Sequence, residues 1–278
     1  MSSSSADPED ITAPLEADGL RARSFKTPRT VIALMLREMS TTYGRSPGGY
    51  LWAVLEPVGA VGMFTLIVAV GLKIRQPSIG VSFPLFFATG ILPFLMYNKI
   101  AGKVSTAVTF SKALLSYPGV TFADAVMGRF ILNALTQVMV FYLVMTGILW
   151  GFETRAILDF GPIVLGLTMA MMLALGIGAL NCYLIPTFPV WASLWGILTT
   201  PLFFLSSIIY TYEDLPQLGR DILWWNPLVH IVGMVRRGFY PTYEATYVTP
   251  VYVFAIAFVT LTLGLLLLRR YHREILNR

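Results

Sequence analysis

The polar residues of this 278-residue chain lack the arrangements that bond-breaking chemistry requires. There is no GxxxxGK(S/T) phosphate loop, no HExxH motif and no Cys/His cluster with metal-ligand spacing. The chain has two histidines, His230 and His272, and one cysteine, Cys182, whose apolar neighbourhood is typical of a buried packing residue. We therefore expect no catalytic residue, metal or cofactor in this chain, so that any uphill process would be driven by another protein.

A few polar side chains instead occur inside apolar segments, where each of them needs a partner. Glu56, beside Pro57, lies near the start of one such segment and can reach the surface or pair with a nearby Arg. Asn133 and Gln137 lie one helical turn apart in another segment. We expect these two amides to form hydrogen bonds between helices rather than to contact a substrate.

The elements that carry these residues are membrane spans. Hydrophobic residues make up 56% of the chain and charged residues 13%, and the mean hydropathy is +0.69. Val251–Leu268 is an uncharged run that stops at Arg269, and at about 1.5 Å per residue it nearly crosses a hydrocarbon core about 30 Å thick. We expect an all-α integral membrane protein with six transmembrane helices, placed near Trp52–Leu72, Val81–Asn98, Ala125–Trp150, Asp159–Cys182, Phe188–Thr211 and Val251–Leu268.

The distribution of basic residues predicts the orientation. Six spans put both termini on one side, and if that side is cytoplasmic, 14 of the 20 Lys and Arg residues lie in inner segments. We therefore expect both termini in the cytoplasm, and we attribute the net charge of +5 to this orientation rather than to nucleic-acid binding. Residues 1–27 contain acids and proline but no signal-peptide pattern, which predicts a disordered cytoplasmic tail.

Residues 28–46 are predicted to form a helix that lies in the cytoplasmic interface. Its apolar residues Ile32, Met35, Leu36, Met39 and Tyr43 share one face, and Leu34 is the one apolar residue outside that face. The opposite face carries polar residues that include Arg37 and Glu38. A membrane anchor and a surface for a partner protein are both compatible with this pattern.

The cytoplasmic segment 103–120 is also amphipathic. Phe110, Ala113, Leu114 and Tyr117 group on one side, while Lys103 and Lys112 remain free. The segment is either a solvated connection or a second helix that transmits force from a cytoplasmic partner into the spans.

The outer segment 213–240 is too apolar for free solution and too charged to cross the membrane. We expect two short re-entrant helices, with a break at Asn226-Pro227. They either anchor the chain at the interface or cap the outer mouth of a path. The residues assigned to this outer cap are Trp224, Trp225, Asn226, His230, Arg236 and Arg237.

Two further patterns lie within the spans. Gly166, Ala170, Ala174 and Gly178 repeat every four residues, which predicts close helix packing. Aromatic residues are abundant in the first and fifth spans, and sugar rings stack on such side chains. The residues assigned to a substrate path are Trp52, Phe64, Trp195, Phe203, Phe204 and Tyr210.

Two stretches together resemble the membrane subunit of an ABC-2 type transporter of the polysaccharide-export group. LMLREMSTTYGRSPGGYLWAVLEP, residues 34–57, has an Arg-Glu pair, a Tyr and a Ser-x-x-Gly turn before Leu-Trp-x-x-x-Glu-Pro. WWNPLVHIVGMVRRGFY, residues 224–240, has Asn-Pro-Leu followed by a basic residue and Gly-Phe-Tyr. The resemblance covers nearly all of residues 28–278, and it is greatest to permeases that export capsular polysaccharide in Gram-negative bacteria.

The resemblance implies a homodimer in the bacterial inner membrane, with two ATPase subunits beneath it that bind ATP and Mg. Two copies would enclose a path between their first and fifth spans, and a periplasmic adaptor and an outer-membrane export protein would complete the route of a polysaccharide that is possibly lipid-linked. The interface helix and the cytoplasmic loop would dock on the ATPases. The residues assigned to docking are Arg37, Glu38, Tyr43, Arg45, Lys103, Phe110, Lys112 and Tyr117.

Other functions share parts of this pattern. Exporters of O-antigen, teichoic acid, small drugs or lipids have the same architectural outline. A polytopic enzyme acting on lipid-linked sugars is a more remote alternative, because the chain has few paired acids and histidines.

Overall fold

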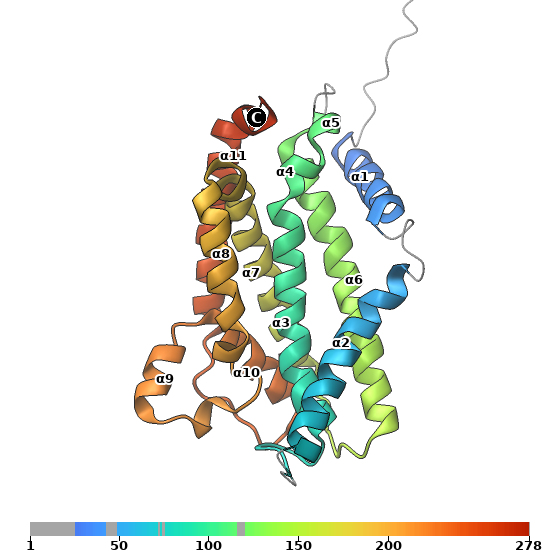
Figure 1. Ribbon diagram of the computed structural model, residues 1–278, viewed down its shortest axis with the longest axis vertical. Coiled ribbons are helices and arrows are strands. Elements are labelled where there is room, and N and C mark those ends of the chain that lie inside the picture. The colour runs from blue at the N-terminus through green and yellow to red at the C-terminus, as the bar shows by residue number, and fades with distance from the viewer. Residues whose placement is uncertain (1–25, 43–48, 72, 74–75, 116–119, 278) are drawn as a thin grey trace, which may run out of the picture.

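The computed structural model describes residues 26–42, 49–71, 73, 76–115 and 120–277, and the regular elements among these residues are helices, with no strand (Figure 1). The predicted tail therefore lies almost wholly outside the described residues, as do Tyr43, Arg45 and Tyr117. The elements are α1 (Lys26–Thr42), α2 (Gly49–Leu66) with its π-helical continuation η1 (Ile67–Gly71), α3 (Phe83–Ser105), α4 (Ala107–Phe110), α5 (Lys112–Leu115), α6 (Phe122–Gly151), α7 (Phe160–Thr187), α8 (Pro189–Leu202), η2 (Phe204–Ser206), η3 (Tyr212–Asp214), α9 (Gln217–Leu223), α10 (Pro227–Phe239) and α11 (Pro250–Asn277).

Five helical segments of the described residues are long and apolar enough to cross a membrane. They are Leu51–Gly71, Phe83–Ser105, Phe122–Gly151, Phe160–Thr187 and Pro250–His272. The predicted fifth span corresponds to α8, which has 14 residues and ends at Leu202 rather than at Thr211. The chain leaves the helical path because η2 follows and Ser207 adopts a left-handed conformation, with φ 55°.

The helices form one bundle around α7, which contacts α3, α10 and α11 (Figure 1). One end of the bundle carries α1, α4, α5 and the last turns of α11, and we call it the α4 end. The opposite end carries α9, α10 and the last turns of α2 and α6, and we call it the α10 end.

Small residues let α7 approach its neighbours closely. Gly166, Ala170, Ala174 and Gly178, the stripe predicted from the sequence, are all buried. A Cβ atom at Gly166 would lie 3.1 Å from the backbone nitrogen of Val235 in α10, so a larger residue would push the two helices apart. The prediction that this stripe serves helix packing is confirmed.

Helix α1 packs on α6 through a face that periodicity did not select. Ile32 and Leu36, on the predicted apolar face, are 55% and 60% exposed, as suits a face turned to lipid. Leu34, which fell outside that face, is buried and lies against Gly128 of α6. Glu38, expected on a free polar face, is buried as well. The predicted helix is present, but its charged side faces protein.

The segment between α8 and α11 contains the two short helices predicted from the sequence, α9 and α10. The break also lies where the sequence placed it. Asn226 is the N-cap of α10, its side chain accepts a hydrogen bond from the backbone N–H of Leu228, and Pro227 occupies the first helical position. Helix α10 is inserted between α3 and α7 and is mostly buried.

Candidate functional site

A group of buried charged side chains lies at the α4 end, where α1 crosses α6. Glu38 is 2% exposed and Arg129 is 5% exposed. Arg129 Nε donates a hydrogen bond to Glu38 Oε1 over 3.1 Å, and Asn133 Nδ2 donates to the same oxygen over 3.4 Å. Because a buried charge is costly unless it is paired, this ion pair fixes α1 to α6. The hydrogen bond expected from Asn133 between helices is confirmed.

Arg129 also reaches the point where α3 gives way to α4. Its Nη1 donates to Thr106 Oγ1 over 2.7 Å, and its guanidinium lies 4.2 Å from the centroid of the Phe110 ring. The guanidinium of Arg37 lies 5.5 Å from the same ring. A single side chain on α6 thus connects α1 with the α3–α4 boundary. We call Glu38, Thr106, Phe110, Arg129 and Asn133 the Arg129 junction.

Three of the predicted docking residues, Arg37, Glu38 and Phe110, meet at this junction. The carboxylate of Glu38 points into the protein, so it is not available to a partner while the ion pair is intact. Lys103 is half-buried in α3, and Lys112, at the start of α5, is exposed.

The charge near the start of the first span has a different partner from the one expected. Glu56 of α2 forms an ion pair with Lys99 of α3, rather than with an arginine, and both side chains are partly exposed. A pair this exposed contributes little to stability. Its main consequence is to give Glu56 a partner on the neighbouring helix.

Some of the aromatic residues assigned to a path form one continuous cluster between α2, α3 and the end of α8. The Phe203 ring lies 5.3 Å from Phe64 and 5.4 Å from Phe204, measured between centroids. Phe94 of α3 packs edge-on against Phe203, also at 5.3 Å. The hydroxyl of Tyr210 donates to the Phe204 carbonyl over 2.8 Å, which connects the loop after η2 to the cluster.

The two tryptophans assigned to the path lie apart from this cluster. Trp195 stacks on Trp191 one turn earlier in α8, with centroids 6.0 Å apart. Trp191 in turn donates to the side chain of Asn181 in α7 over 2.9 Å, which ties α8 to the bundle. Trp52 is 61% exposed on α2.

The outer-cap tryptophans pack on the start of α11. The Trp224 ring stacks on Tyr252 at 5.1 Å and meets Trp225 and His230 edge-on at 5.3 and 5.4 Å. Trp225 is 68% exposed, a position that suits the membrane interface. Asn226 Nδ2 donates to the Leu205 carbonyl over 2.9 Å and thereby joins the cap to the turn after α8.

The buried His230 holds two segments of the cap through both ring nitrogens. The backbone N–H of Thr249 donates to His230 Nδ1 over 3.1 Å, and the Trp224 carbonyl lies 2.8 Å from Nε2. Because the first contact requires an acceptor and the second a donor, the ring is neutral with its proton on Nε2. This arrangement is structural, since both nitrogens are already used.

The two adjacent arginines of α10 differ in their surroundings. Arg236 is 1% exposed, and its Nη1 and Nη2 donate to the carbonyls of Tyr210 and Ile208 over 2.9 and 2.8 Å. Its guanidinium also lies 4.3 Å from the Phe86 ring centroid. Arg237 is exposed. Arg236 therefore fixes the turn after α8 to α10, and only Arg237 presents a free charge.

A polar pocket of about 450 Å³ lies at the α10 end. It is lined by Ser78, Ile79, Thr211, Glu213, Asp214, Thr242, Tyr243, Glu244, Ala245 and Thr246. Tyr243 donates to Glu213 Oε2 over 2.9 Å, and burial raises the pKa of Tyr243, so its proton stays in place. Burial alone would raise the pKa of Asp214, but hydrogen bonds from Thr211 and Ser78 outweigh it and lower that pKa. No three His, Cys, Asp or Glu side chains of the described residues converge as metal ligands would.

The match to a known family covers the elements that carry these sites. The model of the ABC-2 type transporter family matches residues 29–240, which run from α1 to the end of α10. The chain belongs to this family. Both the Arg129 junction and the outer cap of this ABC-2 chain lie within the matched residues, whereas α11 follows them.

Several proteins are similar to this ABC-2 chain along nearly their whole length. The polysialic acid transport protein KpsM of Escherichia coli is 32% identical over 248 residues, which cover 89% of this chain and 95% of KpsM. The capsule polysaccharide export inner-membrane protein CtrC of Neisseria meningitidis serogroup A is 26% identical over 254 residues, which cover 89% of this chain and 92% of CtrC. The capsule polysaccharide export inner-membrane protein BexB of Haemophilus influenzae is 24% identical over 253 residues, with the same coverage.

Sequence reasoning missed Arg129, the residue that organises the α4 end of this ABC-2 chain. In the sequence, Arg129 contributes only as one of the basic residues from which the orientation is predicted. One signal was present: an arginine in the second turn of a long apolar helix needs a buried partner or a route to the surface. Its partners lie 91 and 23 residues away in sequence, so periodicity could not identify them.

Proposed function

We propose that this ABC-2 chain is the membrane-spanning subunit of an ATP-driven exporter that moves a capsular polysaccharide across the bacterial inner membrane. The observation that carries the proposal is the nearly full-length similarity to KpsM, together with that to CtrC and BexB. The five long apolar helices provide the membrane-spanning scaffold that such a subunit requires. The chain itself breaks no bond in this proposal.

The energy would come from ATP-binding subunits, with which ABC-2 permeases of polysaccharide export systems work. We place two of them, carrying ATP and Mg, against the α4 end. Exposed charged residues at this end include Lys112 of α5 and Arg269 and Arg270 of α11. Movement of α4 would reach α6 and α1 together through the Arg129 junction, because Arg129 contacts Thr106, Phe110 and Glu38 at once.

The path would lie between two copies of the chain. Within one copy, α8 has no buried residue, and the share of buried residues is 17% for Leu51–Gly71 and 22% for Pro250–His272, against 78% for Phe83–Ser105. Helices this poorly covered by their own chain are suited to face a second copy, a shared path or lipid. We place the path at α8 and Leu51–Gly71 because the aromatic cluster around Phe203 lies between them and would offer stacking surfaces to sugar rings.

The remaining parts of the proposal concern the two faces of the membrane. The excess of Lys and Arg at the α4 end favours a cytoplasmic location for both termini, and the α10 end would then face the periplasm. The outer cap would close the periplasmic mouth of the path. A periplasmic adaptor and an outer-membrane export protein would receive the glycan there.

Deletion and complementation test the proposed function. Cells that lack this chain should lose one polysaccharide from their surface and accumulate it inside, and the chain supplied in trans should restore export. Loss of capsule would support the proposal, whereas loss of O-antigen or teichoic acid with the capsule intact would assign a different substrate. Normal surface polysaccharides would contradict the proposal altogether.

Purification separates an exporter from an enzyme that acts on lipid-linked sugars. The complex extracted in mild detergent should retain an ATP-binding subunit, which native mass spectrometry detects by its mass. An isolated chain that modifies lipid-linked sugars without such a subunit would favour the enzyme.

A further inference from the structure

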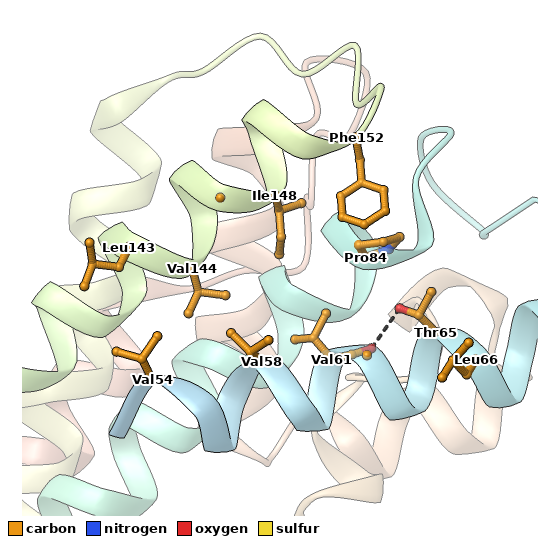
Figure 2. Close-up of a pocket in the computed structure, with 12 residues that line it drawn as sticks. Val54, Val58, Val61, Thr65, Leu66, Pro84, Leu143, Val144, Ile148 and Phe152 are labelled. Atoms are coloured by element: carbon orange, nitrogen blue, oxygen red, sulfur yellow. Dashed lines mark hydrogen bonds between the residues drawn. The ribbon is translucent and has the colours of Figure 1, made fainter. Parts of the chain in front are cut away.

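An apolar crevice runs between α2 and α6, with the start of α3 at one end (Figure 2). Its volume is about 500 Å³, within the range of roughly 300 to 1,000 Å³ typical of ligand pockets. In Figure 2 the side chains of α2 and α6 face each other across it. The lining residues are Val54, Val58, Val61, Gly62, Thr65, Leu66, Pro84, Leu143, Val144, Gly147, Ile148 and Phe152.

The chemistry of the lining selects a hydrocarbon occupant. Thr65 supplies the one side-chain hydroxyl of the lining, and it already donates to the Val61 carbonyl over 2.8 Å. No charged residue lines the crevice. Water would therefore find no hydrogen-bond partners there, and a polar ligand would lose those it brought. A hydrocarbon chain has no hydrogen bonds to lose when it enters the crevice.

The crevice persists because each wall carries a glycine. A Cβ atom at Gly62 or at Gly147 would meet no other atom within 4 Å. Larger residues at these two positions would fill the space from either side. Because Gly62 and Gly147 are exposed, the crevice is open to the surroundings of the bundle, and a molecule from outside the chain can enter it.

The crevice is about as long as one leaflet is thick, although on α2 it begins three residues into Leu51–Gly71 and so extends past the middle of that span. Val54 and Leu66 are 12 residues apart on α2, which at about 1.5 Å per residue is about 18 Å. Half of a hydrocarbon core about 30 Å thick is about 15 Å. Phe152 follows the last residue of α6, so the crevice extends to the end of that helix at the α10 end.

Charge at that end of the crevice favours an anionic headgroup. Lys73 follows the end of η1 by two residues, and Arg155 follows Phe152 by three, so both helices that form the crevice lead into an exposed basic residue. Glu153, which follows Phe152 directly, is also exposed, and two positive charges with one negative charge leave a net charge of +1. A phosphate group at this mouth would gain attraction from both cations.

We propose that the crevice holds one acyl chain of an anionic bilayer phospholipid, drawn from the leaflet at the α10 end, with its phosphate between Lys73 and Arg155. The lipid completes the contact between α2 and α6 that the side chains leave open. It therefore sets the spacing of α2, the least buried span, from the rest of the bundle. This binding does not depend on the proposed export function.

Photolabelling in a defined bilayer tests the proposal. The full chain, with any copurifying subunits, is placed in nanodiscs of phosphatidylcholine with a minority of phosphatidylglycerol whose acyl chain carries a diazirine. After irradiation, label is expected on Val61, Val144 and Ile148, which form the floor of the crevice and are only 4%, 5% and 7% exposed. Absence of label on these residues overturns the proposal.

Variants at glycine distinguish the crevice from general contact with lipid. Gly62→Leu fills the crevice and should abolish labelling of Val144 and Ile148. Gly59→Leu, on the same helix and equally free of neighbours but outside the lining, should leave the labelling unchanged. Gly147→Leu fills the space from α6 and provides a second variant. Equal labelling in Gly62→Leu and Gly59→Leu overturns the proposal.

The headgroup is tested by competition. Native mass spectrometry should show more phosphatidylglycerol than phosphatidylcholine retained per chain from an equal mixture. The combined Lys73→Gln and Arg155→Gln variant should lose this preference and still bind lipid. An unchanged preference would overturn the assignment of the phosphate to these two residues.

Discussion

The buried ion pair between Glu38 and Arg129 predicts how substitutions of these two residues change the free energy of unfolding. Arg129→Met leaves a charged carboxylate buried against apolar surroundings, and breaking a buried pair in this way typically costs about 3–5 kcal/mol. Adding Glu38→Gln removes that charge, so the double variant should be more stable than Arg129→Met alone. Chemical unfolding in detergent, followed by intrinsic fluorescence, measures both differences. Lys112→Ala, an exposed control at the same end, should change little.

The same double variant tests whether the Arg129 junction only stabilises the fold or also couples ATP hydrolysis to transport. If the Arg129 junction transmits movement, the double variant should fold and bind its ATPase subunits but hydrolyse ATP without moving glycan. Reconstituted vesicles give the ratio of glycan transported to ATP consumed. A normal ratio in the double variant would reduce the junction to a packing contact.

Arg236 and Arg237 form a matched pair for a second test at the residue scale. Arg236→Lys cannot donate to both the Tyr210 and Ile208 carbonyls with the planar geometry of a guanidinium, and each hydrogen bond to a charged group contributes about 1.5–3 kcal/mol. We expect a lower melting temperature for Arg236→Lys and no change for the exposed Arg237→Lys. Identical melting of the two variants would show that the turn after α8 does not depend on Arg236.

Among the helices, the contact between α7 and α11 depends most visibly on glycine. A Cβ atom at Gly176 would overlap the Ala257 carbonyl and the Thr260 hydroxyl of α11. Gly176→Ala should therefore destabilise the bundle by about 1–3 kcal/mol, as overpacking of a core does. Gly102→Ala, on α3 with no atom within 4 Å of its added Cβ, should be neutral or slightly stabilising. Size-exclusion chromatography after heating would rank the two variants, and equal survival would contradict the close contact.

Local composition predicted the helices, but it could not predict which face of each helix meets protein. An uncharged run such as Val251–Leu268 crosses a membrane whatever its neighbours are, and Asn226-Pro227 ends one helix and starts another by its own chemistry. The orientation of α1 depends instead on Arg129, 91 residues beyond Glu38. Leu34 seemed out of place because apolar residues in a membrane protein face either lipid or protein, and periodicity does not distinguish the two.

The end of the predicted fifth span illustrates the same limit. The sequence remains apolar through Ile208 and Ile209, so hydropathy extends the span to Thr211. In the structure the helix ends at Leu202, and the following turn is held by Arg236 from α10 and by Asn226 Nδ2. These contacts bring together segments that are distant in sequence, and hydropathy measures only local composition. Among the residues assigned to the outer cap, Asn226, His230 and Arg236 form internal contacts that only the coordinates show. Trp225 and Arg237 are exposed, and the capping role of the group stays a prediction.

For the molecule as a whole, the exposed residues of α8 and α11 suggest which of the two helices would meet the proposed second copy. The exposed residues of α8 include the small or polar Ala192, Ser193, Gly196 and Thr200 beside large apolar ones, whereas most of those of α11 before Arg269 are large and apolar, such as Phe258, Val259 and Leu263. Small and polar residues favour contact between helices in a membrane, and branched apolar residues favour lipid. Ile197→Cys should therefore cross-link to its copy under mild oxidation, and Val259→Cys should not. The reverse result would place the interface on α11.

The orientation of the whole chain can be tested by cysteine labelling, because the native thiol is buried and should not react. Cys182 is 1% exposed, so a membrane-impermeant maleimide should not label the unmodified protein. Ser40→Cys on α1 and Glu244→Cys at the polar pocket of the α10 end place exposed thiols at opposite ends of the bundle. If basic residues hold the α4 end in the cytoplasm, cells with a permeabilised outer membrane should label Glu244→Cys at once and Ser40→Cys only after the inner membrane is opened. The opposite order would put the junction on the periplasmic side, where no ATP-binding subunit could reach it, and the proposed direction of transport would be wrong.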